Sequence, residues 1–268
     1  RAEMEESEKE REELEEEMFN KLRVMKDAVK SGVQGNVVSS SGLIGGDACR
    51  LLQQQDLPGD ALYHRVIIYA LATAEVNAGM GKIVAGPTAG SAGIIPGVVL
   101  ALGEELRLDD RKLVYSLFTA AGLGEIVARK ATLSGAAGGC QAECGVASAM
   151  AAGAAVELAG GSAQMVGHAF ALALKNLLGL SCDPVAGLVE IPCVKRNAFG
   201  ASHALTAATM ALGGVRSLIP VDEVLMAMYQ TGKLLPSVLK ETSRAGLAIT
   251  PTACRIGEKL SEHWENGG

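Results

Sequence analysis

The stretch that most limits the fold of this chain is residues 143–159. It carries two charged residues, Glu143 and Glu157, and otherwise consists almost entirely of alanine, glycine and other small or apolar residues. A helix with this sequence has no polar face, so it must be buried on nearly all sides. We therefore expect it to be the central helix of the domain.

The composition extends this expectation to the whole chain. Of its 268 residues 49% are apolar but only 3% are aromatic, and 33 are glycine. A chain of this length can bury a sizeable core, and a core without large rings must be closed by small side chains that let backbones approach one another. We predict an all-α, compact helical domain built around the central Ala/Gly-rich buried helix, with Gly-rich loops that bind substrate.

Apolar residues at helical spacing predict most of the remaining helices. Asp109 and Thr250 are expected N-caps, and Gly122 with Gly124 are expected to end the helix that Asp109 begins. Residues 188–194 are the one candidate for a strand. The other predicted helices are residues 3–30, 60–78, 98–106, 110–121, 162–178, 198–212, 221–235 and 251–264.

The first 32 residues form a charged N-terminal helix in this prediction, and residues 33–268 form the functional domain. Glutamates crowd the start of the helix, and four basic residues gather toward its end, as the helix dipole favours. A stripe of apolar residues gives it one face for docking, either onto this chain or onto a partner: Leu14, Met18, Leu22, Met25 and Val29.

The charge and the sequence pattern argue against several classes of protein. The net charge of -6 argues against a nucleic-acid partner, which needs a basic face. The chain begins with a Glu-rich run rather than a secretory signal, so we expect the reducing cytoplasm and cysteines that are free, metal-bound or catalytic. Residues 83–103 are uncharged over a membrane-spanning length, but two prolines and five glycines favour a loop over a transmembrane helix.

Two glycine-rich loops offer donors for an anion such as a carboxylate. The first contains Ser39, Ser40, Ser41 and Gly42, and the second, within residues 86–97, contains Thr88, Gly90 and Ser91. Either loop could instead be a connector, and the second has the small-residue spacing of closely packed helices. Neither a Walker motif nor G-x-G-x-x-G occurs, so nucleotide phosphate is not supported as a ligand.

Four of the six cysteines lie within residues 138–197. Cys140, Cys182 and Cys193 are separated by 42 and 11 positions, and no C-x-x-C pair is present. Zinc knuckles and ferredoxins use closer pairs, so spacing alone favours small, buried, inert cysteines over metal ligands.

Three motifs in order along the chain carry a resemblance. GPTAGSAGIIPGV, GGCQAE and LSCDPVAGLVEIPCVKRN are together similar to the alpha chain of the bacterial iron-sulfur-dependent L-serine dehydratase. The similarity covers essentially the whole chain from about residue 33.

The resemblance implies that Cys140, Cys182 and Cys193 ligate a 4Fe-4S cluster and leave one iron open. That iron would act as a Lewis acid while L-serine is dehydrated and deaminated to pyruvate and ammonia, a lyase reaction of amino-acid catabolism. Cys144, Cys49 and Cys254 fall outside the ligand set, and we expect them to be small buried residues.

The remaining site residues follow from donor content and from the resemblance. The two loops are expected to hold the substrate carboxylate. Lys195 and Arg196 either add positive charge near the site or form a solvated pair. No catalytic base is recognisable among His64, His168, His203 and His263. The resemblance implies that a beta chain completes the active site, so we expect a hetero-oligomer.

Two alternatives remain open at the level of sequence. One is an iron-sulfur redox or sensor protein without lyase activity, in which Cys144 is an extra ligand. The other is a helical scaffold or membrane protein whose cysteines are structural.

Overall fold

The computed structural model describes residues 2–265, and in them the backbone is helical with no named strand. The all-α prediction is confirmed. The segment of residues 188–194, our candidate strand, forms a loop that enters a helix at Cys193. The α-helices are α1 (Ala2–Ser7), α2 (Arg11–Val33), α3 (Asp47–Leu52), α4 (Ala61–Ala78), α5 (Ile94–Glu105), α6 (Asp110–Lys130), α7 (Gly135–Gly138), α8 (Val146–Leu158), α9 (Ala163–Asn176), α10 (Cys193–Leu212), α11 (Val221–Leu234) and α12 (Pro251–Glu265).

In the described part of the chain, short turns complete the helical structure. A π-helical turn, Gln141–Gly145, leads directly into α8. The 3₁₀ turns are η1 (Ala89–Ser91), η3 (Val185–Gly187), η4 (Ser237–Leu239) and η5 (Gly246–Ile249).

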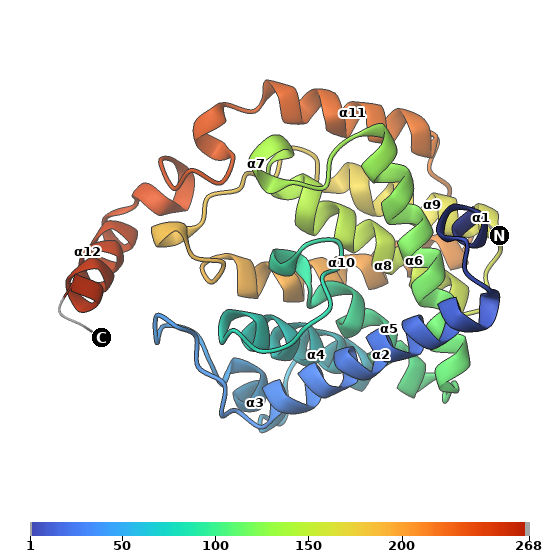
Figure 1. Ribbon diagram of the computed structural model, residues 1–268, viewed down its shortest axis with the longest axis horizontal. Helices are drawn as coiled ribbons and strands as arrows, with labels where there is room; N and C mark the ends of the chain where they lie inside the picture. Colours follow the sequence, from blue (N-terminus) through green and yellow to red (C-terminus); the bar gives the residue numbers. More distant parts are fainter. Residues whose placement is uncertain (1, 266–268) are drawn as a thin grey trace.

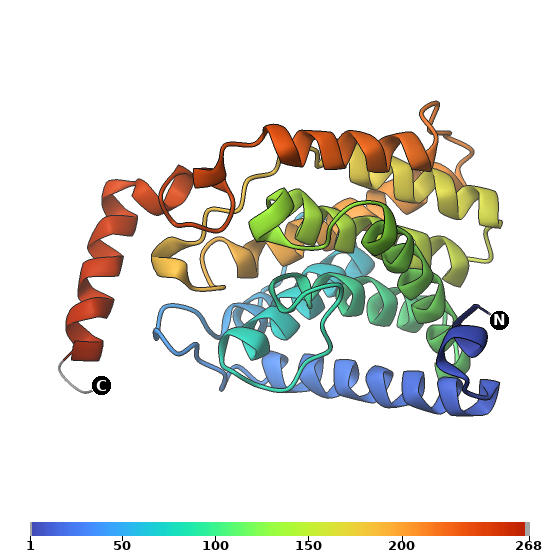
Figure 2. The ribbon, with the colours of Figure 1, turned by 45° about the horizontal axis from the view of Figure 1, so that its top comes forward.

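Helix α8 lies at the centre of the molecule, as its sequence predicts. It packs against α5, α6, α9 and α10, and every residue of it except Glu157 is buried. Figure 1 shows α8 inside the body, with α2 along one side and α11 along the opposite side. The same arrangement is seen in Figure 2 after rotation.

Helix α2 docks on this body through its apolar stripe. Leu22, Met25 and Val29 are buried and belong to the main hydrophobic core together with residues of α4, α5 and α6. The chain turns between α1 and α2, where Glu8 adopts a φ of 55°, so residues 3–30 are two helices rather than one. The division of the chain near residue 33 stays a prediction.

Several helices cross at glycine, which explains how a core with few rings is filled. A Cβ on Gly32 of α2 would lie 2.3 Å from the main-chain oxygen of Ala72 in α4. A Cβ on Gly97 of α5 would lie 2.9 Å from the main-chain oxygen of Val66. The small-residue spacing of residues 86–97 therefore serves helix packing in its second half.

The predicted end of α6 is wrong. Gly122 and Gly124 lie inside the helix, which continues to Lys130. Its apolar stripe continues to Val127, and a Cβ on Gly124 would meet the side chain of Met150 in α8 at 2.8 Å, so Gly124 is a contact site rather than a terminus.

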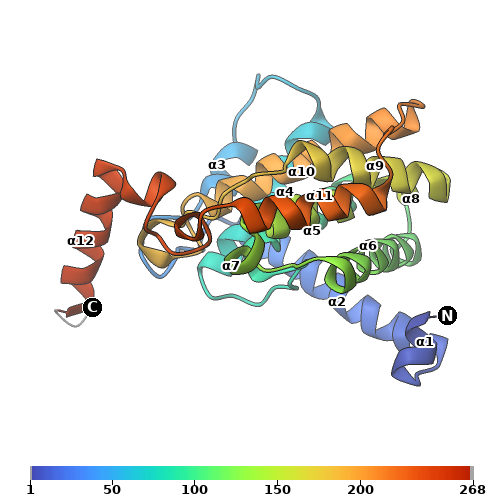
Figure 3. The same cartoon turned by 90° about the horizontal axis from the view of Figure 1, so that it is seen from above.

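Helix α12 stands apart from the rest. Seen from above in Figure 3, it lies at the end of the molecule opposite α1, away from the helical body. Its contacts are with the turns η3 and η5. Within the described residues, no helix combines the length and hydropathy that crossing a membrane would require.

Candidate functional site

The three cysteines of the predicted ligand set come from three different segments. Cys140 precedes the π-helical turn, Cys182 lies in the loop after α9, and Cys193 is the first residue of α10. Cys140 and Cys182 are buried, and Cys193 is half-buried. Figure 1 shows the intervening segment, in yellow, running out toward α12 before it returns to α10.

Electrostatic interactions act among these three thiols, so the fold brings them into one region of the molecule. Burial, and then the charge that Cys140 would carry, raises the pKa of the Cys193 thiol to about 12. The same two causes, in the same order, raise the pKa of Cys182 well above its ordinary value. A hydrogen bond from Cys144 lowers the pKa of Cys140.

Gln141 holds the Cys140 turn against the loop that leads to Cys182. Its side chain is fully buried; it donates to the carbonyl of Met228 at 3.0 Å and accepts from the amide of Gly179 at 2.9 Å. Its main-chain amide donates to the carbonyl of Leu180 at 3.1 Å. π-helical turns inside helices are frequent at functional sites, and here the turn lies between Cys140 and the central helix.

The segment before α12 holds Cys182 from the other side. The Cys182 amide donates to the carbonyl of Leu239 at 2.8 Å, and its carbonyl accepts from the amide of Glu241 at 2.8 Å. Asp183 accepts from the amide of Leu247 at 2.9 Å. The position of Cys182 therefore depends on residues 239–247.

Arg196 links Cys193 to Cys182. It lies one turn after Cys193 on α10, and its guanidinium donates to the carbonyl of Ser181 at 2.9 Å and to the carboxylate of Asp183 at 2.9 Å. These two acceptors flank Cys182. The guanidinium charge also acts to lower the pKa of Cys140, so it favours a thiolate there.

Glu143 is a carboxylate that contacts the thiol of Cys182, and our interpretation of the sequence treated it only as a charge on the central helix. The Cys182 thiol lies 3.9 Å from Oε2 of Glu143. The Glu143 carboxylate also accepts a hydrogen bond from the side chain of Thr88. Burial raises the pKa of its carboxyl. The sequence signal that could have identified Glu143 is a single acidic residue that lies three positions after Cys140 and precedes an otherwise apolar run.

The second glycine-rich loop lies beside this carboxylate. Thr88 contacts Glu143, and a Cβ on Gly90 would lie 3.7 Å from Glu143 Oε1. Ser91 is fully buried and donates to the carbonyl of Gly86 at 3.2 Å, so its hydroxyl shapes the loop from inside. Of the predicted clamp residues, the structure brings Thr88 and Gly90 to Glu143, which lies against the Cys182 thiol.

The first loop is directed differently. The hydroxyl of buried Ser39 donates to the carboxylate of Glu190 at 2.7 Å, and Ser41 donates to the same oxygen. Ser40 and Gly42 are exposed. This loop is therefore bonded to the cysteine segment through Glu190. The Glu190 carboxylate accepts hydrogen bonds from two of the hydroxyls that we predicted to bind substrate.

Lys195 forms an ion pair with Asp47 at the start of α3. Its side chain is 47% exposed. The neighbouring Arg196, rather than Lys195, is the cation that contacts the cysteine segment.

The other cysteines depart from expectation in two cases. Cys144 is buried as predicted, but Cys254 on α12 is exposed and Cys49 is half-buried. All six cysteines are free thiols.

The chemistry of the three thiols fits the iron-sulfur group that the resemblance implies. Within the described part of the chain, no three histidine, cysteine, aspartate or glutamate side chains converge closely enough to hold a single metal ion. In an iron-sulfur cluster each cysteine binds a different iron, so its thiols surround a volume. A donor set of thiols from three segments, close enough to influence one another's ionisation and with an arginine nearby, fits such a group.

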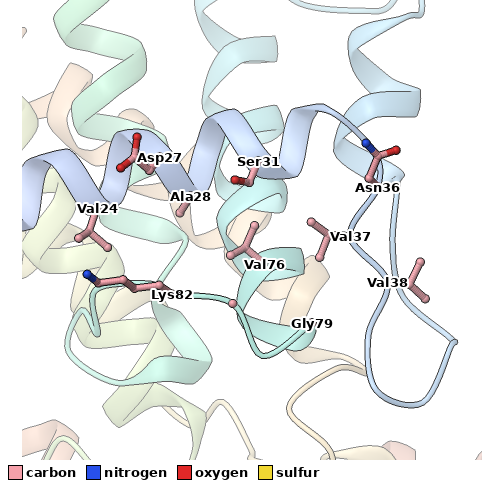
Figure 4. Close-up of a pocket in the computed structure, with 11 residues that line it drawn as sticks. Val24, Asp27, Ala28, Ser31, Asn36, Val37, Val38, Val76, Gly79 and Lys82 are labelled. Atoms are coloured by element: carbon pink, nitrogen blue, oxygen red, sulfur yellow. The ribbon is translucent and has the colours of Figure 1, made fainter.

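A surface hollow of about 490 Å³ lies elsewhere, between the end of α2, residues 36–38 and the turn after α4. Figure 4 shows Asp27, Ser31, Asn36 and Lys82 at its rim, all of them exposed. None of the cysteines lines it.

Comparison with known proteins shows to which family the chain belongs. A family model described as serine dehydratase alpha chain matches residues 1–248. The chain belongs to this family. The match begins before residue 33, where we had expected the resemblance to start, so the family includes α2.

Members of this family with curated descriptions resemble the chain closely. The probable L-serine dehydratase, alpha chain, of Bacillus subtilis (strain 168) is 52% identical over 262 residues, which cover 96% of this chain and 87% of the relative. The L-serine dehydratase, alpha chain, of Peptoniphilus asaccharolyticus is 42% identical over 250 residues, 90% of this chain and 85% of the relative. L-serine dehydratase 2 of Escherichia coli (strain K12) is 37% identical over 258 residues, 91% of this chain but 56% of the relative.

Proposed function

We propose that this chain is the catalytic alpha chain of an L-serine dehydratase, an L-serine ammonia-lyase that uses a 4Fe-4S cluster. The observation that carries the proposal is the meeting of Cys140, Cys182 and Cys193 beside Glu143 and the loop of Thr88. Cys140, Cys182 and Cys193 would hold the cluster. When bound through three cysteines, the cluster supplies a Lewis acid at its fourth iron, which makes hydroxide a tolerable leaving group.

The overall reaction needs no oxidant or reductant. Loss of water from L-serine gives aminoacrylate, which tautomerises to an imine, and addition of water to the imine releases ammonia and pyruvate. One water leaves and one enters, so the atoms balance.

The residues of this chain would bind and orient the substrate. The main chain around Gly90 and Ser91 offers donors for the substrate carboxylate beside Glu143, and the hydroxyl of Thr88 would join them only by leaving Glu143. In the first loop, Ser40 and Gly42 are exposed and free to contribute, whereas Ser39 and Ser41 would first have to release Glu190. Lys195 would serve the site only by leaving Asp47.

The catalytic base is assigned in this proposal to a partner beta chain. His64 and His203 each form a hydrogen bond with a main-chain carbonyl, that of Pro58 at 2.8 Å and that of Ala173 at 2.9 Å. Relatives are described as alpha chains, and the longer Escherichia coli relative extends well beyond the matched region. A hetero-oligomer that acts in the reducing cytoplasm is consistent with the free thiols.

Anaerobic reconstitution tests the proposal. The chain should turn brown and bind about four iron and four sulfide ions. It should form pyruvate from L-serine once the partner chain is added. A Cys144→Ala variant should keep its iron, whereas Cys193→Ala should lose it. Protein that stays colourless after reconstitution, or a cluster that depends on Cys144, would contradict the proposal.

A further inference from the structure

Asn197 is a fully buried amide one turn after Cys193. Its side chain is 1% exposed, in the first part of α10. Its Nδ2 donates to the carbonyl of Gly90 at 2.8 Å and to the carbonyl of Cys193 at 2.9 Å. Its Oδ1 accepts from the amide of Gly93 at 2.8 Å. Both amide hydrogens and the oxygen are therefore used.

The orientation of this amide follows from its partners. If the oxygen and nitrogen were exchanged, the NH₂ group would face the Gly93 amide and the oxygen would face two carbonyls, so every contact would be repulsive. A carboxylate or a hydroxyl cannot reproduce the set, because the first lacks donors and the second is too short to reach both loop groups.

The partners of Asn197 lie within the turn η1, just after it, and on the helix that begins with Cys193. Gly90 is within η1, and Gly93 follows it at the start of α5. The loop is also held from behind by α4, since a Cβ on Gly93 would lie 2.2 Å from the main-chain oxygen of Ala70. Ser91 fixes the internal shape of the loop, whereas Asn197 fixes its place relative to Cys193.

We propose that Asn197 is the positioning residue that holds the Thr88–Ser91 loop at the cysteine site, so that the substrate carboxylate is bound at the right distance from the cluster. The inference rests on the proposed function, and it adds the residue that joins the Thr88–Ser91 loop to the start of α10 at Cys193. Asn197 would touch neither substrate nor cluster. A displacement of the loop by about 1 Å is enough to impair catalysis strongly, because the reacting groups must stay aligned.

The test is an Asn197→Ala variant, reconstituted anaerobically with the partner chain. Asn176→Ala is the matched control, because Asn176 is exposed on the helical body and its long contact is with His203. We expect the iron content of Asn197→Ala to equal that of the wild type. Its KM for L-serine should rise about tenfold, as loss of an interaction near 1.4 kcal/mol requires. The serine concentration that half-saturates the change in the cluster's visible absorption spectrum should rise by the same factor. The control should show none of these changes.

The outcomes separate this inference from the proposed function. A wild type without a cluster or a serine response would overturn both. A functional wild type with an unchanged KM and serine titration in Asn197→Ala would overturn the inference alone, and so would loss of iron, since Asn197 would then position Cys193. If Asn197→Ala does not fold, Asn197→Asp keeps the volume and the acceptor for Gly93 and should show the same rise in KM with full iron. Failure of both variants to fold would make Asn197 a residue of the core only.

Discussion

At the scale of single residues, the site depends on side chains that fix one segment against another. The cysteines are visible in the sequence, and the resemblance names which three matter. Which neighbours hold them is decided by tertiary contacts: Arg196 flanks Cys182, Glu143 lies against its thiol, and Glu190 takes the hydroxyls of Ser39 and Ser41. A count of donor side chains in the sequence cannot show that a carboxylate of the same chain, here Glu190, already accepts their hydrogen bonds.

Arg196→Lys separates the charge of this residue from its geometry. Lysine keeps the charge but cannot bond the Ser181 carbonyl and the Asp183 carboxylate with one planar group. Because a hydrogen bond to a charged group contributes about 1.5–3 kcal/mol, we expect Cys182 to be held loosely. Iron retained after gel filtration with a chelator should fall several-fold. Lys195→Gln, at the adjacent exposed position, should keep its iron. Equal retention in the two variants would show that Arg196 does not set the geometry.

At the scale of helices, local pattern predicted most elements and tertiary packing decided the rest. The predicted helices of residues 60–78, 198–212 and 221–235 correspond to α4, α10 and α11, with α10 beginning earlier, at Cys193. The short helices α3 and α7 were missed because six and four residues carry no periodic signal. Gly122 looked like a helix end, but the apolar stripe that α8 covers continues past it.

Two glycine substitutions test how the helices pack. In Gly32→Ala the new methyl group would meet the main chain of α4 at 2.3 Å, where nothing can yield except the helix itself. We expect the free energy of unfolding to fall by about 1–3 kcal/mol. In Gly122→Ala the added Cβ has no neighbour within 4 Å, so the variant should gain about 0.5–1 kcal/mol from helix propensity. Chemical denaturation measures both, and equal effects would refute the packing explanation.

At the scale of the whole molecule, most of the buried core lies outside the thiol site. The main core joins α2, α4, α5, α6, α8, α9, α10 and α11, and Cys140 and Cys182 also belong to it. The segment of residues 239–247, by contrast, is tied to Cys182 and Asp183 and leads to α12, which lies apart from the body. The small residues of the sequence predicted the core, but the sequence did not predict that α12 would lie away from the helical body.

Cys182→Ala should therefore abolish iron binding and activity while leaving most of the helical circular dichroism unchanged. Hydrogen exchange should increase in residues 239–247 and not in α8, because the core does not need the cluster to bury its faces. Cys254→Ala, at an exposed position of α12, is the control and should behave as the wild type. General unfolding of Cys182→Ala would mean that the thiol site also holds the core together.

The most direct test of the account is Mössbauer spectroscopy of the reconstituted complex, recorded anaerobically with and without L-serine. The account predicts that serine changes the signal of one iron of the cluster and leaves the three cysteine-bound irons as they were. Four irons that all keep their signals when serine is bound and turned over would contradict it.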